Sequence, residues 1–279
     1  MGRVVGRRRV VRINGTRRSV APDTVAGEEP LEIRVGGQPL AVTMRTPGDD
    51  FDLVAGFLVT EGVVGRASEI ARMRYCADGD RATGTQGLHN NYNVVDVDLA
   101  VGVEPPSERV RRNFYISSSC GVCGKASVAS VRTAGRYEVA EDPVRLAPSV
   151  LSSLPELLRE SQRVFERTGG LHAAGLFTAD GRLLAAREDV GRHNAVDKLV
   201  GWALRGDRLP LTGRILLVSG RTSFELTQKA YLAGIPVLAA VSAPSTLAVD
   251  LAAEVGITLV GFLRGDTMNV YAGSWRIAE

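Results

Sequence analysis

Long apolar runs are absent from this sequence of 279 residues. No run reaches the roughly 20 residues that a membrane-spanning helix needs, and the start lacks the apolar stretch of a secretory signal. We therefore expect a cytoplasmic protein that does not enter a membrane. The net charge is only +3, so the chain as a whole is not expected to bind nucleic acid or another polyanion.

Cysteine and histidine are scarce, with three of each. An odd number of cysteines argues against a disulfide framework and favours a metal-binding or redox-reactive role. Cys120 and Cys123 form a Cys-x-x-Cys pair among serines and glycines, which let the backbone turn sharply and leave the sulfurs unshielded. The neighbouring Lys125 favours the thiolate form. Cys76 has no partner in the sequence, and we expect it to be structural.

Four kinds of chemistry compete for this dithiol. A zinc site needs two further ligands, and no second paired motif exists. A thioredoxin-like exchanger usually carries the motif after its first strand, not in mid-chain. A nucleobase deaminase needs a His-x-Glu motif ahead of its cysteines, and residues 172–174 come after them and lack the glutamate. The fourth candidate is a thiolate that receives sulfur as a persulfide and releases it by exchange. The possible further zinc ligands are Cys76, His89, His172 and His193.

The first half of the chain reads as β-rich. Residues 1–27 form a basic arm, expected to be solvated and frayed, with a strand at 10–13 and a turn at Asn14 and Gly15. Alternating residues at 31–35 and 40–44 around two glycines predict a β-hairpin. We expect a packing helix from Asp49 or Asp50 to about Gly62, strands at 70–76 and 93–99, and a polar loop at 79–91.

The second half alternates strands and helices, so the fold class is α/β, or α+β for the whole chain. We expect a short strand at 113–116, helices at 149–167 and 189–204, and strands at 171–177 and 183–187. The apolar strands at 215–219, 235–241 and 257–262, with helices between them, predict parallel βαβ units. We place domain boundaries at 1–27, 28–112 and 113–279.

Ligands of such units bind beyond the carboxyl ends of the strands. Three loops there combine glycine or proline with hydroxyl side chains, a pattern that suits a phosphate-bearing ligand but also suits ordinary capped turns. Near a helix start, His193 is a candidate for proton transfer, and Arg192 beside it is a possible accessory residue. His172 sits in an apolar strand, where a histidine is more often part of the core. The loop candidates are Ser219, Gly220, Arg221, Ser242 and residues 263–267.

Several motifs taken together resemble the FdhD family, the sulfur carriers that active formate dehydrogenase requires. The resemblance runs from about Glu28 to the C-terminus and leaves the arginine-rich start outside. The motifs are Ser-Ser-Ser-Cys-Gly-Val-Cys-Gly-Lys at 117–125, Thr-Gly-Gly-Leu-His at 168–172, Glu-Asp-Val-Gly-Arg-His-Asn-Ala-Val-Asp-Lys at 188–198 and Ser-Gly-Arg-Thr-Ser at 219–223.

The resemblance implies a sulfurtransferase that takes sulfur from a cysteine desulfurase and passes it to bis-molybdopterin guanine dinucleotide, the molybdenum cofactor of formate dehydrogenase. It implies a cytidine-deaminase-like C-terminal domain without the zinc chemistry, and a homodimer. By position, Cys120 matches the persulfide-bearing cysteine and Cys123 the second thiol. A segment that binds the GDP-like part of the cofactor falls on Phe262, Leu263, Arg264, Gly265, Asp266 and Thr267.

No resident metal is expected from this resemblance. A different class of protein is the alternative, namely a zinc-stabilised chaperone that shields the cofactor without catalysing a reaction. Stoichiometric zinc on Cys120 and Cys123 would favour that alternative, whereas one added sulfur on Cys120 would favour the carrier.

Overall fold

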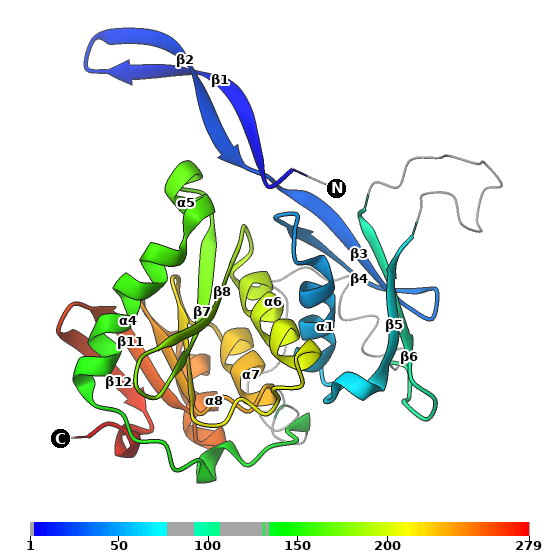
Figure 1. Ribbon diagram of the computed structural model, residues 1–279. Helices are drawn as coiled ribbons and strands as arrows, with labels where there is room; N and C mark the ends of the chain where they lie inside the picture. Colours follow the sequence, from blue (N-terminus) through cyan, green and yellow to red (C-terminus); the bar gives the residue numbers. More distant parts are fainter. Residues whose placement is uncertain (1–2, 77–91, 107–130, 132–133, 279) are drawn as a thin grey trace.

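The computed structural model describes residues 3–76, 92–106, 131 and 134–278 (Figure 1). Cys120, Cys123 and Lys125 lie outside the described residues. So do the predicted loop at 79–91 and the predicted strand at 113–116.

The larger sheet has six strands in the order β12-β11-β10-β9-β7-β8. Strands β9, β10 and β11 are parallel, as the sequence predicts, and helices α7 and α8 connect them. Helix and sheet together confirm the α/β class. The strands are β7 (His172–Thr178), β8 (Leu183–Asp189), β9 (Arg214–Val218), β10 (Val237–Ala240), β11 (Thr258–Arg264) and β12 (Thr267–Ala272).

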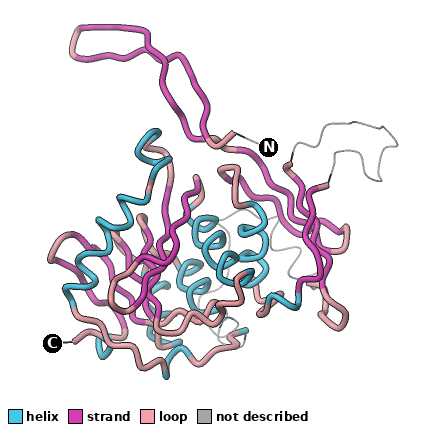
Figure 2. Tube along the Cα trace, in the orientation of Figure 1, coloured by secondary structure: helices cyan, strands magenta, loops and turns pink. Residues whose placement is uncertain are grey.

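Helices cover both faces of this sheet (Figures 1 and 2). On one face, α4 (Pro148–Ser161) contacts β7, β8, β9 and β11. On the other face lie α6 (Arg192–Arg205), α7 (Phe224–Leu232) and α8 (Thr246–Val255). The strands are apolar on both sides because both sides are covered. Each face therefore has its own buried apolar cluster, one with Leu154 and Phe177 and the other with Leu216 and Leu251.

The smaller sheet has four strands in the order β4-β3-β6-β5. The predicted hairpin is confirmed, because β3 pairs antiparallel with β4 and its turn contains two glycines in the left-handed region. Short 3-10 turns lie at Ala67–Glu69, Val139–Glu141 and Ser274–Arg276. The strands are β3 (Glu29–Val35), β4 (Gln38–Arg45), β5 (Ile70–Tyr75) and β6 (Val94–Leu99).

Helix α1 (Asp50–Thr60) joins the two sheets through a close contact with α6. One buried cluster contains Leu31 of β3 together with Leu199 of α6 and Leu216 of β9. The predicted domains 28–112 and 113–279 thus share an apolar core, and their boundaries stay a prediction.

Two glycines allow the backbones of α1 and α6 to touch. A Cβ on Gly56 would overlap the backbone oxygen of Asp197, and one on Gly201 would overlap that of Asp52. Neither neighbour can turn aside, since both are main-chain atoms of helices. We expect Gly201→Ala to lower the free energy of unfolding by about 3 kcal/mol through forced separation of the helices.

Guanidinium denaturation at neutral pH measures this loss. Gly6→Ala is the matched control, because an added Cβ there meets only the flexible Arg8 side chain and one Val25 methyl. A cost at Gly201 no larger than that at Gly6 would contradict the close crossing.

Two predicted helices differ in the structure. The helix expected at 149–167 is two helices, α4 and α5 (Arg163–Thr168), which meet at Gln162. The backbone N–H groups of Val164 and Phe165 donate to the carboxylate of Glu188, at 2.9 and 2.7 Å, so α5 starts afresh on that side chain. Helix α6 begins at Arg192 and not at Asp189, because Asp189 ends β8.

The N-terminal arm differs as well. Residues 5–26 form a hairpin of two ten-residue strands, β1 (Val5–Asn14) and β2 (Arg17–Ala26), and not a frayed end with one short strand. The turn at Asn14 and Gly15 is confirmed, with Gly15 in the left-handed region. This hairpin projects away from the body of the molecule in Figures 1 and 2.

Candidate functional site

The carboxyl end of β9 meets the start of β7 at one edge of the larger sheet. The backbone N–H of Ala173 donates to the Ser219 hydroxyl at 2.9 Å, and the N–H of Ser219 donates to the carbonyl of Ala173 at 3.0 Å. A Cβ on Gly220 would lie 3.2 Å from the His172 Nδ1 atom, so the imidazole packs over this glycine. The structure therefore brings the predicted residues His172, Ser219 and Gly220 together.

The loops after β9 and β10 are joined by main-chain hydrogen bonds. The N–H of Thr222 donates to the carbonyl of Ala243 at 3.1 Å, and the N–H of Ser245 donates to the carbonyl of Thr222 at 2.9 Å. Ser245 then caps α8 through the N–H of Ala248. Arg221 is exposed beside this junction. The two loops form one continuous rim.

The segment from Phe262 to Thr267 reaches the same rim, with one correction to its form. Strand β11 continues to Arg264, so only Gly265 and Asp266 form the turn before β12. The N–H of Phe262 donates to the carbonyl of Ser242 at 3.2 Å, and Arg264 Nε donates to the carbonyl of Val241 at 3.3 Å. The third predicted loop therefore lies beside the second, mostly as strand.

Leu263 does not offer its side chain to a ligand. It is fully buried in the apolar cluster under α4. A bulge between Gly261 and Arg264 and a left-handed φ of 53° at Phe262 leave the Phe262 ring 39% exposed. Sequence alternation could not locate this bulge, and the binding role of the segment stays a prediction.

A pocket of about 620 Å³ opens between this edge of the sheet and the α4–α5 junction. Its volume falls in the usual range for small-molecule sites. His172 and Ser219 line it from the sheet, and Gln162 lines it from the helix break. Around them lie Leu158, Phe165, Leu171 and Val241, with Pro155, Arg159, Gly169 and Gly170.

Sequence reasoning missed the helical wall of this pocket. Arg159 stacks over the Phe165 ring with 4.9 Å from its guanidinium carbon to the ring centroid, which fixes the aromatic at the pocket. Gln162 is buried although it is polar. The only local signal was a polar residue on the apolar side of an expected helix, and the break itself depends on the distant Glu188.

Burial lowers the pKa of His172, and the nearby Arg192 and His193 lower it further. The imidazole is therefore neutral at pH 7 and offers one nitrogen as a hydrogen-bond acceptor. A neutral ring suits a wall that contacts a polar ligand without adding charge.

His193 has a different environment, at the start of α6. Its Nε2 atom lies 3.2 Å from the Ser223 hydroxyl and 2.9 Å from Glu225 Oε2. The hydrogen bond from His193 lowers the pKa of Glu225. A Ser-His-acid triad needs the two partners on opposite ring nitrogens, whereas here both are on one. This cluster is not a nucleophilic triad, and His193 and Arg192 are not among the residues that line the pocket beside His172.

A buried charged cluster lies behind these residues, between α1 and α7. Lys229 donates to both carboxylate oxygens of Asp197 at 2.9 Å and to the Thr60 hydroxyl at 2.9 Å, and Glu61 Oε1 lies 3.9 Å from its Nζ. Burial acts to lower the pKa of Lys229, but Asp197 and Glu61 outweigh it and hold the pKa above its usual value. Burial raises the pKa of Glu61 to about 7.

Glu61 should make stability depend on pH. Its folded pKa of about 7 lies above the ordinary value of 4.5. The stability that this group contributes is therefore present below about pH 4.5 and is lost as the pH rises through about 7. We expect Glu61→Gln to remove a fall of about 2 kcal/mol in the free energy of unfolding between these pH values. Denaturant titrations of both proteins at pH 5 and pH 8 measure the difference. Parallel pH dependence of the two proteins would contradict the prediction.

Among the described residues, no group of three or more acidic, histidine or cysteine side chains could hold a metal ion. No helix in the same part of the chain is long and apolar enough to cross a membrane.

A profile of the FdhD/NarQ family matches residues 26–278. The chain belongs to this family. Curated FdhD/NarQ relatives named sulfur carrier protein FdhD include that of Streptomyces avermitilis, which is 63% identical over 279 residues, 100% of this chain and 97% of the relative. That of Mycobacterium tuberculosis is 57% identical over 277 residues, 99% of this chain and 100% of the relative.

One solved structure is also similar to this FdhD/NarQ protein. It is described as a formate dehydrogenase accessory protein from Desulfotalea psychrophila, and it aligns with a TM-score of 0.75 and 25% identity over 99% of this chain and 100% of that chain. The likeness supports the mixed α/β arrangement of both sheets.

Proposed function

We propose that this FdhD/NarQ protein is a cytoplasmic sulfurtransferase that takes sulfur from a cysteine desulfurase and passes it to the molybdenum cofactor of formate dehydrogenase. One observation carries the proposal: a Cys-x-x-Cys pair at Cys120 and Cys123 in a chain whose full-length relatives are named sulfur carriers. The substrate that receives the sulfur is bis-molybdopterin guanine dinucleotide, and the working form is a homodimer.

The first step is thiol exchange at Cys120. The Cys120 thiolate attacks the outer sulfur of the desulfurase persulfide, an S–S bond forms on Cys120, and the desulfurase cysteine leaves as a thiolate. The moved sulfur keeps its proton, so the step needs no external oxidant or reductant.

The second step releases the sulfur to the cofactor. The Cys123 thiolate attacks the inner sulfur of the Cys120 persulfide, which forms the Cys120–Cys123 disulfide and frees the outer sulfur as hydrosulfide for the metal. The two thiols supply the two electrons that reduce that sulfur. A thiol reductant then restores the dithiol, and the cycle is balanced.

The pocket beside His172 supports binding of the guanine nucleotide part of the cofactor. Phe165 and Leu158 give apolar walls for a base, while Ser219 and Gln162 give polar groups at the sheet edge and the helix break. Holding the nucleotide there would tether the metal end of the cofactor near the protein, so that delivery becomes an effectively intramolecular reaction.

A transfer assay tests the proposal. The protein is loaded with radiolabelled sulfur by a desulfurase and cysteine, separated from the desulfurase, and mixed with formate dehydrogenase that carries unsulfurated cofactor. We expect label to appear in the cofactor and formate oxidation to begin. Label that stays on the protein, with no gain of activity, would overturn the transfer role.

A further inference from the structure

Among the described residues, the N-terminal arm, residues 3–27, contacts the body near its base, where strand β2 also packs against helix α5. Within the arm, the N–H of Gly27 donates to the carbonyl of Val4 at 2.7 Å. Toward the body, the Thr46 hydroxyl donates to the carbonyl of Gly27 at 3.0 Å, and a Cβ on Gly170 would lie 3.5 Å from the Ala26 Cβ. The outer part of the ribbon stands clear of the body (Figure 1). An isolated two-stranded hairpin is at best marginally stable in water, so a free ribbon of this length needs a reason.

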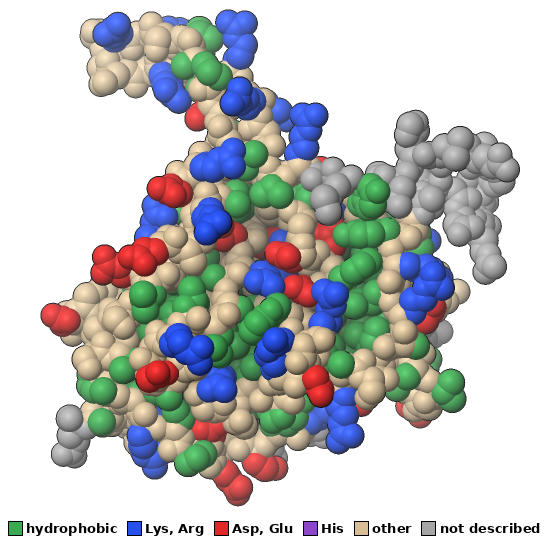
Figure 3. Space-filling model, in the orientation of Figure 1, with side chains coloured by type: hydrophobic (Ala, Val, Ile, Leu, Met, Phe, Trp, Pro, Cys, Tyr) green, Lys and Arg blue, Asp and Glu red, His purple; other side chains and the backbone are tan. Residues whose placement is uncertain are grey.

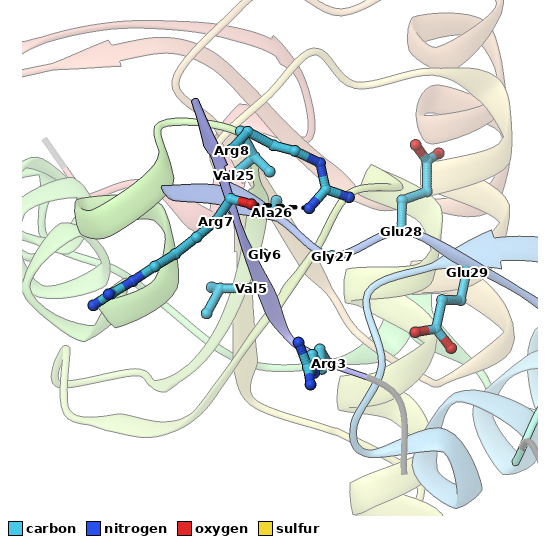
Figure 4. Close-up of a pocket in the computed structure, with 10 residues that line it drawn as sticks. All are labelled: Arg3, Val5, Gly6, Arg7, Arg8, Val25, Ala26, Gly27, Glu28 and Glu29. Carbon is cyan, nitrogen blue, oxygen red and sulfur yellow. Dashed lines mark hydrogen bonds between the residues drawn. The ribbon is translucent and has the colours of Figure 1, made fainter. Parts of the chain in front are cut away.

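The base of the arm is not itself a ligand site. A pocket of about 450 Å³ lies there, and Arg3, Arg7 and Arg8 are among its lining residues. Figure 4 shows that their guanidinium groups point in different directions, with that of Arg7 on the opposite side from Glu28 and Glu29. These guanidinium groups do not converge on one point where an anion could bind. We therefore look for the function of the arm in its projecting part.

The charge of the arm is strongly one-sided. It carries seven arginines, no lysine and one acidic residue, Asp23, whereas the chain as a whole is only +3. The remainder of the molecule therefore carries a net negative charge. Figure 3 shows the basic side chains spread along the projecting ribbon. An excess of positive charge has a simple explanation, because charged side chains keep exposed strand edges from pairing with other chains.

The two faces of the ribbon are not alike, and this asymmetry argues against charge alone. Opposite residues of antiparallel strands share a face, and residues two apart along a strand share it too. One face thus carries Val11 opposite Val20 and Ile13 opposite Arg18, with Arg9 next along the strand. We call this set the apolar face. The side chain of Val11 is 46% exposed, that of Val20 is 59% exposed and that of Ile13 is 71% exposed.

The opposite face also carries the apolar residues Val10, Ala21 and Val25, of which Val25 is 37% exposed, less than any of the three on the apolar face. It holds the single acidic residue of the arm, which lies opposite Arg8 and 3.5 Å from Arg12, so part of its positive charge is neutralised internally. Arg17 lies on this same face, opposite Asn14. The apolar face has no acid at all. If arginines served solubility alone, exposed apolar residues would not be gathered where positive charge is left unpaired.

We propose that the apolar face of the arm is a docking surface for an acidic protein partner. Exposed apolar side chains framed by arginines match a protein surface with an apolar centre and a carboxylate rim. Nucleic acid would use the charge but not the valines and isoleucine. A second arm would place arginines against arginines. The choice of partner rests on the proposed function, which requires contact with a sulfur donor and a recipient enzyme.

Two double variants of the full-length protein test this assignment. Arg9→Glu/Arg18→Glu changes the apolar face, and Arg8→Glu/Arg17→Glu makes the same charge change on the opposite face. The probes are purified cysteine desulfurase and purified formate dehydrogenase, each titrated by calorimetry at physiological salt. We expect the first variant to bind at least one probe about tenfold or more weakly, while the second stays within about threefold of the unchanged protein.

Val11→Asp supplies an uncharged-to-charged change at the centre of the same face and should show the same loss. Equal losses for both double variants, or no loss with either probe, would overturn the docking surface. So would a change of oligomeric state in sedimentation that is confined to the apolar-face variants. Failure of the proposed function would appear separately, as a protein that binds both probes yet takes up no sulfur.

Discussion

Cys120→Ala should abolish sulfur uptake from a desulfurase while leaving nucleotide binding within about twofold of the unchanged protein. The physical reason is that only a thiolate can attack the donor persulfide, and alanine has no sulfur to hold the product. The described residues that line the pocket at His172 and Ser219 are unchanged in this variant, so nucleotide binding there should not respond. Uptake is measured with radiolabelled cysteine, and binding is measured by titration with GDP.

Two further variants serve as a control for this result and as a test of the release step. Cys76→Ala is the matched control. Cys76 follows β5 and is half-buried, and its backbone N–H donates to the carbonyl of Val94. It should keep full uptake. Cys123→Ser should still load sulfur but fail to release it to the cofactor. Uptake that survives in Cys120→Ala, or that disappears in Cys76→Ala, would contradict the assignment of Cys120 as the acceptor.

Lys198→Met should destabilise the protein by about 3–5 kcal/mol. Its Nζ lies 2.7 Å from Asp189 Oδ2 and donates to the carbonyl of Thr46 at 2.8 Å, and both charged side chains are almost completely buried. Methionine fills similar volume but leaves the Asp189 carboxylate without its counter-charge. Thermal and guanidinium denaturation measure the loss.

The double variant Asp189→Asn/Lys198→Met gives the control for this prediction. With both charges removed, the cost should be clearly smaller than the sum of the two single changes, because neither partner is left as an unpaired buried ion. A cost below about 1 kcal/mol for Lys198→Met alone, or simple additivity, would contradict the importance of this pair.

Local patterns in the sequence predict much of the fold. The alternation around Gly36 and Gly37 gives the β3–β4 hairpin, and continuous apolar strands give the parallel unit of β9, β10 and β11. Both signals depend on neighbours a few residues apart. Ser219 and Gly220 could be expected at the carboxyl end of β9 for the same reason, whereas the approach of His172 depends on the antiparallel pairing of β7 with β9.

What the sequence could not reveal depends on contacts between distant residues. The break between α4 and α5 depends on Glu188, which lies more than 20 residues later in the chain. The bond from the Thr46 N–H to Asp189 joins residues 143 positions apart. No periodicity encodes such pairings, so the pocket wall at Phe165 and the buried ion pair both had to come from the structure.

The arm shows a different kind of limit. Its arginines suggested a frayed end because charge repels, yet the paired strands leave one face for Val11, Val20 and Ile13. The turn at Asn14 was visible in the sequence, whereas the length of pairing was not. Register decides which side chains share a face, and a shift of one residue would exchange the two faces.

The most direct test of the account is peptide mass spectrometry of the full-length protein after incubation with cysteine desulfurase and cysteine, with zinc measured on the same sample. The account predicts a gain of one sulfur atom on the peptide that contains Cys120, reversed by a thiol reductant, and no stoichiometric zinc. An unchanged Cys120 peptide together with one zinc ion per chain would contradict it.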